Sequence, residues 1–176
     1  MRAQVKTMPL LESAREAVEH LKTVSLFEEI KPYPGALEQI AEIMETRNYS
    51  PGDSIITEGE GGGEMYLLIA GEASVYKSTA EGDHYKVAIL KGENHAFFGE
   101  GGLLDSDPRS ATIKADTLCT CMVLERSRFE SFGRKNPQWA LPILSRIARA
   151  VMARLRKTNN DLLLLYNALV SEVRGE

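Results

Sequence analysis

The spacing of hydrophobic positions along this 176-residue chain predicts helices at its start. Apolar residues there recur every three to four positions, which is the repeat of one face of an α-helix. A first helix is predicted with an apolar face formed by Leu10, Leu11, Ala14, Ala17, Val18 and Leu21. A second is predicted from Gly35 to Arg47, with an apolar face formed by Leu37, Ile40, Ile43 and Met44. Pro32 and Pro34 separate the two helices, because proline interrupts helical hydrogen bonding.

Between Tyr49 and Leu124 the pattern changes to short apolar runs that alternate with turns. Runs rich in Val, Ile, Thr and Tyr occupy residues 54–58, 65–70, 73–78, 85–90, 110–115 and 118–124. Glycine-containing turn signals lie at 51–53, 60–64, 70–72, 80–83 and 91–94. Short strands at spacings near ten residues favour an all-β sandwich or barrel.

After Arg126 the helical pattern returns. A short helix is predicted to end near Asn136, and Pro137 suits the first turn of a second helix that runs to about Val173. Pro142 must lie within the first turns of that helix or kink it. The chain therefore divides into an N-terminal helical segment (1–48), a β-barrel (49–125) and C-terminal helices (126–176), a mainly β fold with flanking helices.

Composition is that of an ordinary globular protein, with 43% hydrophobic and 26% charged residues. No apolar run approaches the roughly 20 residues that span a bilayer. The first 21 residues lack the continuous apolar stretch of a signal peptide, so we expect a cytoplasmic protein that does not enter a membrane. Cys119 and Cys121, two apart on a predicted strand, are expected to be reduced thiols that fill space.

Charge is unevenly distributed. The net charge is −4, yet residues 126–157 hold nine basic residues and a single acidic one, Glu130. Such a segment can bind a polyanion. More often it is the solvated face of a helix that docks on an acidic body, and we favour that interpretation.

Residues 97–112 contain most of the candidate ligand-binding residues of the chain. Gly101, Gly102 and Leu103 follow a predicted strand and should open a short helical turn, whose first amides can face an anion. Glycine also lets a phosphate approach the backbone closely. The turn is therefore a candidate phosphate contact.

Three side chains of the same segment supply the other groups that a cyclic nucleotide requires: a cation, a hydroxyl and a hydrogen-bond acceptor for the ribose. Arg109 offers a planar guanidinium that suits bidentate contact with a phosphate better than lysine does. Ser110 adds a hydroxyl beside it. Glu100 can accept a hydrogen bond from a ribose hydroxyl.

The order of these residues resembles a known motif. The pattern Phe-Gly-Glu, two residues, Leu-Leu, a spacer and Pro-Arg-Ser-Ala-Thr (98–112) is similar to the phosphate-binding cassette of cyclic-nucleotide-binding domains. That family includes kinase regulatory subunits, gated channels and bacterial catabolite-activator regulators. The run at 51–72 is similar to the family's early strands, and the resemblance covers about Leu26 to Leu169. It implies a β-roll, a double-stranded β-helix or jelly-roll barrel, with N-terminal helices and a long C-terminal helix.

The resemblance implies a regulatory or sensor protein whose ligand is cAMP or cGMP. Glu100 would hold the ribose 2′-hydroxyl, Arg109 the phosphate, and the backbone of Gly102 and Ser110 further phosphate oxygens. The full set implied in the cassette is Gly99, Glu100, Gly101, Gly102, Leu103, Arg109 and Ser110. Cyclic AMP is favoured, because cGMP-selective relatives often carry Thr where this chain has Ser110. One departure is the pair Gly101-Gly102, where the family usually has an aliphatic and then a small residue.

The C-terminal helix carries a heptad seam formed by Leu144, Ala148, Val151, Leu155, Thr158, Leu162, Leu165 and Leu169. Exposing such a seam would leave a large apolar patch, so we expect a homodimer through this helix. Thr158 interrupts the seam. By resemblance to catabolite-activator-like domains, Thr158 would contact the base in its own subunit and Asn159 the base across the dimer.

Other functions lack the residues they require. His20, His84 and His95 are scattered and include no closely spaced pair of the kind that cupin metal sites use, so no metal or cofactor is expected. The sequence shows no serine-hydrolase motif or phosphate-binding P-loop, and we expect no enzyme.

Partners other than the nucleotide are less defined. Seven residues follow Leu169, too few for a helix-turn-helix, so sequence-specific DNA binding by this chain alone is not expected. A downstream protein partner remains open. The alternative functions are a barrel that has lost its ligand, or a fragment of a larger regulator whose basic helical surface engages a protein or a nucleic acid.

Overall fold

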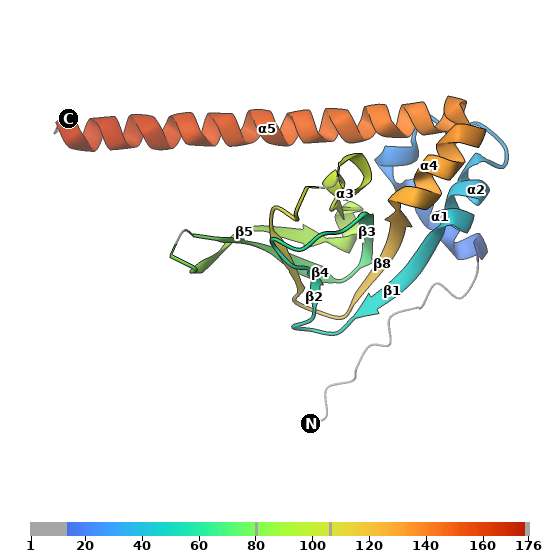
Figure 1. Cartoon of the computed structure of the whole chain (residues 1–176), viewed down its shortest axis with the longest axis horizontal. Coiled ribbons are helices and arrows are strands. Elements are labelled where there is room, and N and C mark those ends of the chain that lie inside the picture. Colours follow the sequence, from blue (N-terminus) through green and yellow to red (C-terminus); the bar gives the residue numbers. More distant parts are fainter. Residues whose placement is uncertain (1–13, 80, 106, 175–176) are drawn as a thin grey trace, which may run out of the picture.

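The computed structural model describes residues 14–79, 81–105 and 107–174. Helices gather at one side of a β-roll, and the long helix α5 (Pro137–Arg174) crosses above it and extends past it at the C-terminal end (Figure 1). This is the mainly β fold with flanking helices that the sequence predicts. Leu10 and Leu11 of the first predicted helix lie outside the described residues.

The N-terminal segment folds into α1 (Ala14–Thr23), a 3₁₀ turn η1 (Ser25–Phe27) and α2 (Ala36–Ile43). The predicted apolar faces are confirmed for α1 at Ala17, Val18 and Leu21 and for α2 at Leu37 and Ile40, all of which are buried. The second helix was predicted too long. It ends at Ile43, and Met44–Tyr49 forms strand β1, which pairs with β8 (Cys119–Glu125) from Met44 opposite Leu124 to Tyr49 opposite Cys119. Ladder pairing with β8 outweighs the weak helical preference of these residues.

Two antiparallel four-stranded sheets make the roll. The first has the order β1-β8-β3-β6, with β3 at Glu64–Ala70 and β6 at Phe97–Phe98. The second has the order β2-β7-β4-β5, with β2 at Ser54–Ile56, β7 at Thr112–Ala115, β4 at Glu72–Ser78 and β5 at His84–Lys91. A second 3₁₀ turn, η2 (Gly92–Asn94), joins β5 to β6.

The two central strands of the first sheet, β8 and β3, are buried on both faces, which explains their continuous apolar runs. Along β3, Met65, Leu67 and Ile69 pack against the helices. Tyr66 and Leu68 alternate with them and face the second sheet, together with Cys119, Cys121 and Val123 of β8. This alternation is the two-residue period of a strand, and it divides the interior into a helix-side and a roll-side cluster.

Two C-terminal helices complete the fold, as predicted. Helix α4 (Arg126–Lys135) follows β8 directly, and α5 continues through Pro142 in its second turn. Ala140, Ile143 and Ile147 of α5 are buried against the N-terminal helices and α4. No helix in the described residues is apolar over enough of its length to cross a membrane.

Candidate functional site

A cavity of about 620 Å³ opens between the second sheet, the segment 97–111 and helix α5. Its volume is in the range of small-molecule sites. One wall is apolar and comes from Ile56, Val75, Ala88, Leu90 and Ile113. A second, more polar part of the lining contains six of the seven residues that the sequence predicts in the cassette: Gly99, Glu100, Gly101, Gly102, Arg109 and Ser110.

The polar wall is built on a tight turn. Gly99 has φ 71°, a left-handed conformation that favours glycine, and it redirects the chain from β6 into the short helix α3 (Gly101–Leu104). The Gly102 amide donates to the Gly99 carbonyl at 2.9 Å, so it faces the turn in this conformation. Leu103, the seventh predicted residue, does not line the cavity. It is buried in the helix-side cluster and anchors α3 there.

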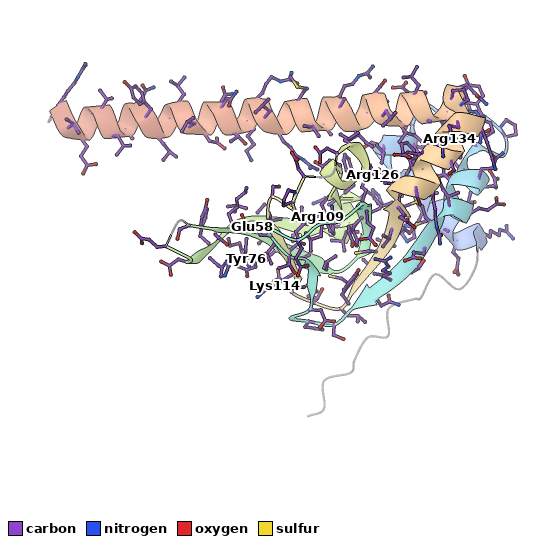
Figure 2. The ribbon with its side chains drawn as sticks, in the orientation of Figure 1. Glu58, Tyr76, Arg109, Lys114, Arg126 and Arg134 are labelled. Atoms are coloured by element: carbon purple, nitrogen blue, oxygen red, sulfur yellow. The ribbon has the colours of Figure 1, made fainter. Side chains whose placement is uncertain are left out.

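Arg109 is held at both its backbone and its side chain. Its amide donates to the Glu60 carbonyl at 2.8 Å, and its carbonyl accepts from the Gly59 amide at 2.9 Å. Its guanidinium is buried, with the residue 9% exposed, and lies near α3 at the centre of the roll (Figure 2). The one guanidinium hydrogen bond among the described residues goes from Nη1 to the Gly99 carbonyl at 3.0 Å. Since arginine has five N–H donors, several remain for a ligand.

Three glycines make room for this guanidinium. A Cβ atom at Gly62 or at Gly102 would lie 2.6 Å from an Arg109 nitrogen, and one at Gly99 would lie 3.0 Å from Nη1. At Gly102 the same atom would also meet the carbonyl oxygens of Glu64 and Gly62 at 2.8 and 2.9 Å. Gly101, by contrast, has nothing within 4 Å of its Cβ position. Gly102 therefore has a steric role, because a side chain there would collide with Arg109 and with two backbone carbonyls.

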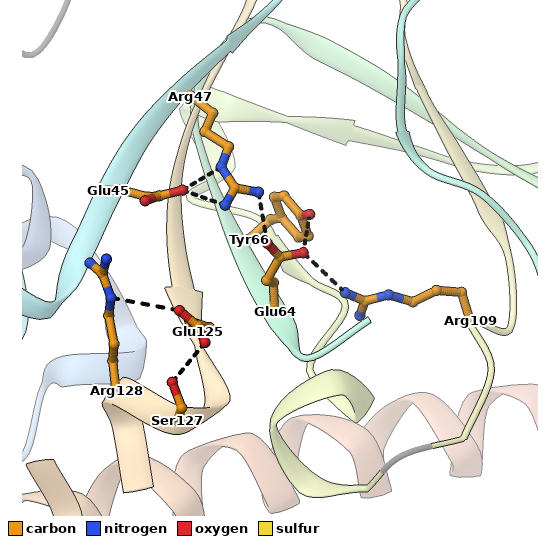
Figure 3. A network of polar contacts seen from close by, with 8 residues as sticks. All are labelled: Glu45, Arg47, Glu64, Tyr66, Arg109, Glu125, Ser127 and Arg128. Atoms are coloured by element: carbon orange, nitrogen blue, oxygen red, sulfur yellow. Dashed lines mark hydrogen bonds and ion pairs between the residues drawn. The ribbon is translucent and has the colours of Figure 1, made fainter. Parts of the chain in front are cut away.

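The carboxylate of Glu64 joins Arg109 to a network of polar side chains (Figure 3). Glu64 lies 3.9 Å from Arg109 Nη2, accepts a hydrogen bond from Arg47 Nη1 at 2.8 Å and another from the Tyr66 hydroxyl at 2.9 Å. Burial raises the pKa of Glu64, but the hydrogen bonds and the charges of both arginines outweigh burial and lower it overall. Glu64 is therefore ionised near neutral pH, and its negative charge favours the guanidinium position seen here.

Helix α5 contributes a cation to the cavity. Arg154 pairs with the carboxylate of Glu100, donates from Nη2 to the Phe97 carbonyl at 2.9 Å and lies 5.1 Å from the centre of the Phe97 ring. Glu100 is 14% exposed, so this ion pair is partly shielded from solvent. Together with Val151, Arg154 brings α5 to the cavity wall. A ligand in the cavity would therefore contact both the cassette and the helix.

Thr158 and Asn159 are not brought to the cavity. Both are exposed on α5 and neither lines it. Thr158 follows Val151 by seven residues, so it shares that face of the helix about 10 Å farther along. Asn159 lies on the adjacent face, beyond Leu155. Contact of either residue with a base stays a prediction.

The sequence alone did not identify Gly62, Glu64 and Arg154 as site residues. The run of glycines at 61–63 signalled a turn, but only the fold shows that it lies against Arg109. Val151 and Arg154 are three residues apart on one helix face, a spacing that could have pointed to Arg154 as a cavity residue.

The basic segment is largely engaged within the molecule. Among the residues that the structure describes, ion pairs join Arg128 to Glu125, Arg134 to Glu130, Arg146 and Arg149 to Glu29, and Arg154 to Glu100. The interpretation of a helix that docks on acidic groups fits these contacts better than a polyanion surface does. Within the described residues, no cluster of three or more His, Cys, Asp or Glu side chains could hold a metal ion.

Curated relatives and solved structures point to the same family. The chain is 38% identical to a cAMP-dependent protein kinase regulatory subunit of Colletotrichum orbiculare over 110 residues, which is 62% of this chain and 26% of the relative. It is 32% identical to one of Dictyostelium discoideum over 113 residues, 63% of this chain and 34% of that relative. This chain thus matches about a quarter to a third of the length of these relatives.

Two solved structures share the fold at similar identity. The catabolite activator protein of Thermus thermophilus has a TM-score of 0.69 and 26% identity, over 80% of this chain and 62% of that one. A structure described as Sp-2Cl-cAMPS bound to PKAR CBD2 has a TM-score of 0.65 and 29% identity, over 85% and 90%. The family model of the cyclic nucleotide-binding domain matches residues 46–136, more than half of the sequence. The chain therefore belongs to the cyclic nucleotide-binding domain family.

Proposed function

We propose that this protein binds a cyclic purine mononucleotide in the cavity and acts as a regulatory module of the cytoplasm rather than as an enzyme. The observation that carries the proposal is Arg109. Within the described part of the chain this buried guanidinium donates one hydrogen bond, and its neighbouring carboxylate, Glu64, lies 3.9 Å away, so donors remain for an anion in the nucleotide-sized cavity. A cyclic phosphodiester supplies one negative charge and two oxygens for bidentate contact.

The rest of the cavity suits the rest of such a ligand. Glu100 lies on the same wall and can accept the ribose 2′-hydroxyl, once Arg154 shares or releases it. The apolar wall, with Val75 and Leu90, offers a surface for the flat base. Cyclic AMP is the favoured ligand, since the relatives are named as cAMP-dependent regulatory subunits and Ser110 occupies the position where cGMP-selective members often carry Thr.

Regulation would pass through α5. Because Val151 and Arg154 line the cavity, a bound nucleotide changes the energy of the helix position relative to the roll. The shift can be no larger than the difference in ligand affinity between the two helix positions. We further propose that α5 joins two copies in a homodimer and passes the change to a downstream protein partner.

Calorimetric titration tests the proposed function. Cyclic AMP is expected to bind with one site per chain and more tightly than cGMP. Linear 5′-AMP is the control, because its doubly charged terminal phosphate lacks the compact ring and should bind far more weakly. Absence of binding heat with both cyclic nucleotides would favour the barrel that kept its fold and lost its ligand.

A further inference from the structure

Arg126, the first residue of α4, fastens two other segments of the chain. Its backbone N–H donates to the Gly63 carbonyl, in the loop before β3, at 2.7 Å. Its side chain donates from Nε to the Gly102 carbonyl of α3, also at 2.7 Å. The residue is half-buried, and Figure 2 labels it beside α3, where α4 begins. One residue at the end of β8 therefore joins the loop, the cassette helix α3 and α4.

The two segments that Arg126 joins are the ones that confine the Arg109 guanidinium. The loop contributes Gly62 and α3 contributes Gly102, two positions at which a Cβ atom would lie 2.6 Å from an Arg109 nitrogen. The loop and α3 also touch each other, because the same atom at Gly102 would lie 2.9 Å from the Gly62 carbonyl oxygen. The spacing between the loop and α3 therefore sets the space in which the guanidinium lies.

Helix α3 needs support from outside to keep that spacing. It has four residues, two of them glycine, and within the described residues its N-cap Glu100 makes no side-chain capping bond. Each glycine weakens a helix by about 1 kcal/mol relative to alanine, and so short a helix is unstable by itself. Leu103 anchors α3 through apolar contacts. Arg126 adds a charge-assisted hydrogen bond, which is about twice as strong as one between neutral groups.

We propose that Arg126 is a positioning residue of the phosphate site. It holds α3 at a fixed distance from Arg109, and so sets the geometry in which the backbone donors of α3 and the guanidinium meet the two exocyclic oxygens of a cyclic phosphate. It lines a neighbouring cavity of about 580 Å³ with Gly62, Gly63 and Glu64, and it is not among the described residues that line the nucleotide cavity. The proposal rests on the proposed function and adds to it a residue that the ligand does not touch.

The two phosphorothioate diastereomers of cAMP test this geometry. Each replaces one exocyclic oxygen by sulfur, which is a weaker hydrogen-bond acceptor. The guanidinium can meet both positions, whereas the backbone donors of α3 can serve only the one on their side. The wild type is therefore expected to bind the two diastereomers with affinities that differ by about tenfold or more, the value of a hydrogen bond to a charged group.

Arg126→Met removes the guanidinium and keeps an unbranched side chain and the backbone bond to Gly63. Calorimetric titration should show a roughly tenfold loss of cAMP affinity and a ratio between the diastereomers that falls to within about threefold. Arg126→Lys can still donate to the Gly102 carbonyl, so it should recover part of both. The ratio is decisive, because a smaller fraction of competent protein lowers both apparent affinities by the same factor.

Arg128→Met is the matched control. It removes the same charge from the same helix, where Arg128 lies 3.7 Å from Glu125, and should leave both the affinity and the ratio as in the wild type. A wild-type ratio in Arg126→Met, or an equal loss of the ratio in Arg128→Met, would overturn the role of Arg126. A wild type that binds cAMP without distinguishing the diastereomers would refute the positioning role alone. A wild type that binds neither cAMP nor the analogues would instead refute the proposed function.

Discussion

Replacing Arg109 with alanine is expected to remove most binding of the cyclic nucleotide. A charged hydrogen-bonded pair that loses one buried partner costs about 2–5 kcal/mol. This corresponds to a weakening of about 30-fold to several thousand-fold. The guanidinium is the buried cation of the cavity wall, whereas Arg154, the other cation there, is half exposed and paired with Glu100. Calorimetric titration of Arg109→Ala with cAMP measures the loss.

Two further variants separate charge and geometry from folding. Arg109→Lys keeps the charge and loses the planar fork, so its affinity should lie between those of the wild type and the alanine variant. Arg134→Ala removes the same charge from the surface of α4, where it pairs with Glu130, and should bind as the wild type does. If Arg109→Ala folds with an unchanged thermal midpoint and binds cAMP within threefold of wild type, Arg109 is not the phosphate ligand.

Alanine at Gly102 is expected to disrupt the site, whereas alanine at Gly101 is not. A Cβ atom at Gly102 would lie 2.6 Å from Arg109 Nη1 and within 3 Å of two carbonyl oxygens, so the turn or the guanidinium must move. Overpacking of this kind costs about 1–3 kcal/mol, or roughly 5- to 150-fold in affinity if the loss falls on the bound state. At Gly101 the space is open, and alanine favours a helical turn over glycine by about 1 kcal/mol.

The comparison requires thermal unfolding and cAMP titration of both variants. Gly101→Ala should unfold at the same or a higher temperature and bind at least as tightly as the wild type. Gly102→Ala should lose affinity, stability or both. The same behaviour from both variants would mean that close packing between α3 and Arg109 is not what shapes the cassette.

Local chemistry explains why much of the fold could be predicted from the sequence. Turns between the strands contain Gly52, Gly59, Gly71 and Gly82, whose φ angles lie between 83° and 93°. Glycine favours this conformation, so the turns of the β-region could be located from the residue types. The faces of α1 and α2 follow from a 3.6-residue period. Strand β1 escaped prediction because Met44 alone is buried in it and no strict alternation marks it. Its identity depends on pairing with β8, some 75 residues away.

The candidate site also combines residues that could be predicted from the sequence with residues that could not. Residues 99–110 could be assigned from one contiguous motif. Gly62, in the loop before β3, and Glu64, at the start of β3, lie against Arg109, and Arg154 reaches Glu100 from α5, so these contacts depend on the tertiary fold. The apolar heptad positions of α5 could be predicted, but which side of the helix stays exposed could not. That depends on which side of α5 the rest of the chain covers.

A crystal structure of the protein with cAMP tests the central claim most directly. We expect the nucleotide in the cavity between α3 and α5, with both exocyclic phosphate oxygens about 2.7–2.9 Å from the Arg109 guanidinium, the distance of a charged hydrogen bond. The ribose 2′-hydroxyl should donate to Glu100. A nucleotide bound elsewhere, or one in the cavity whose phosphate does not touch Arg109, would contradict the account.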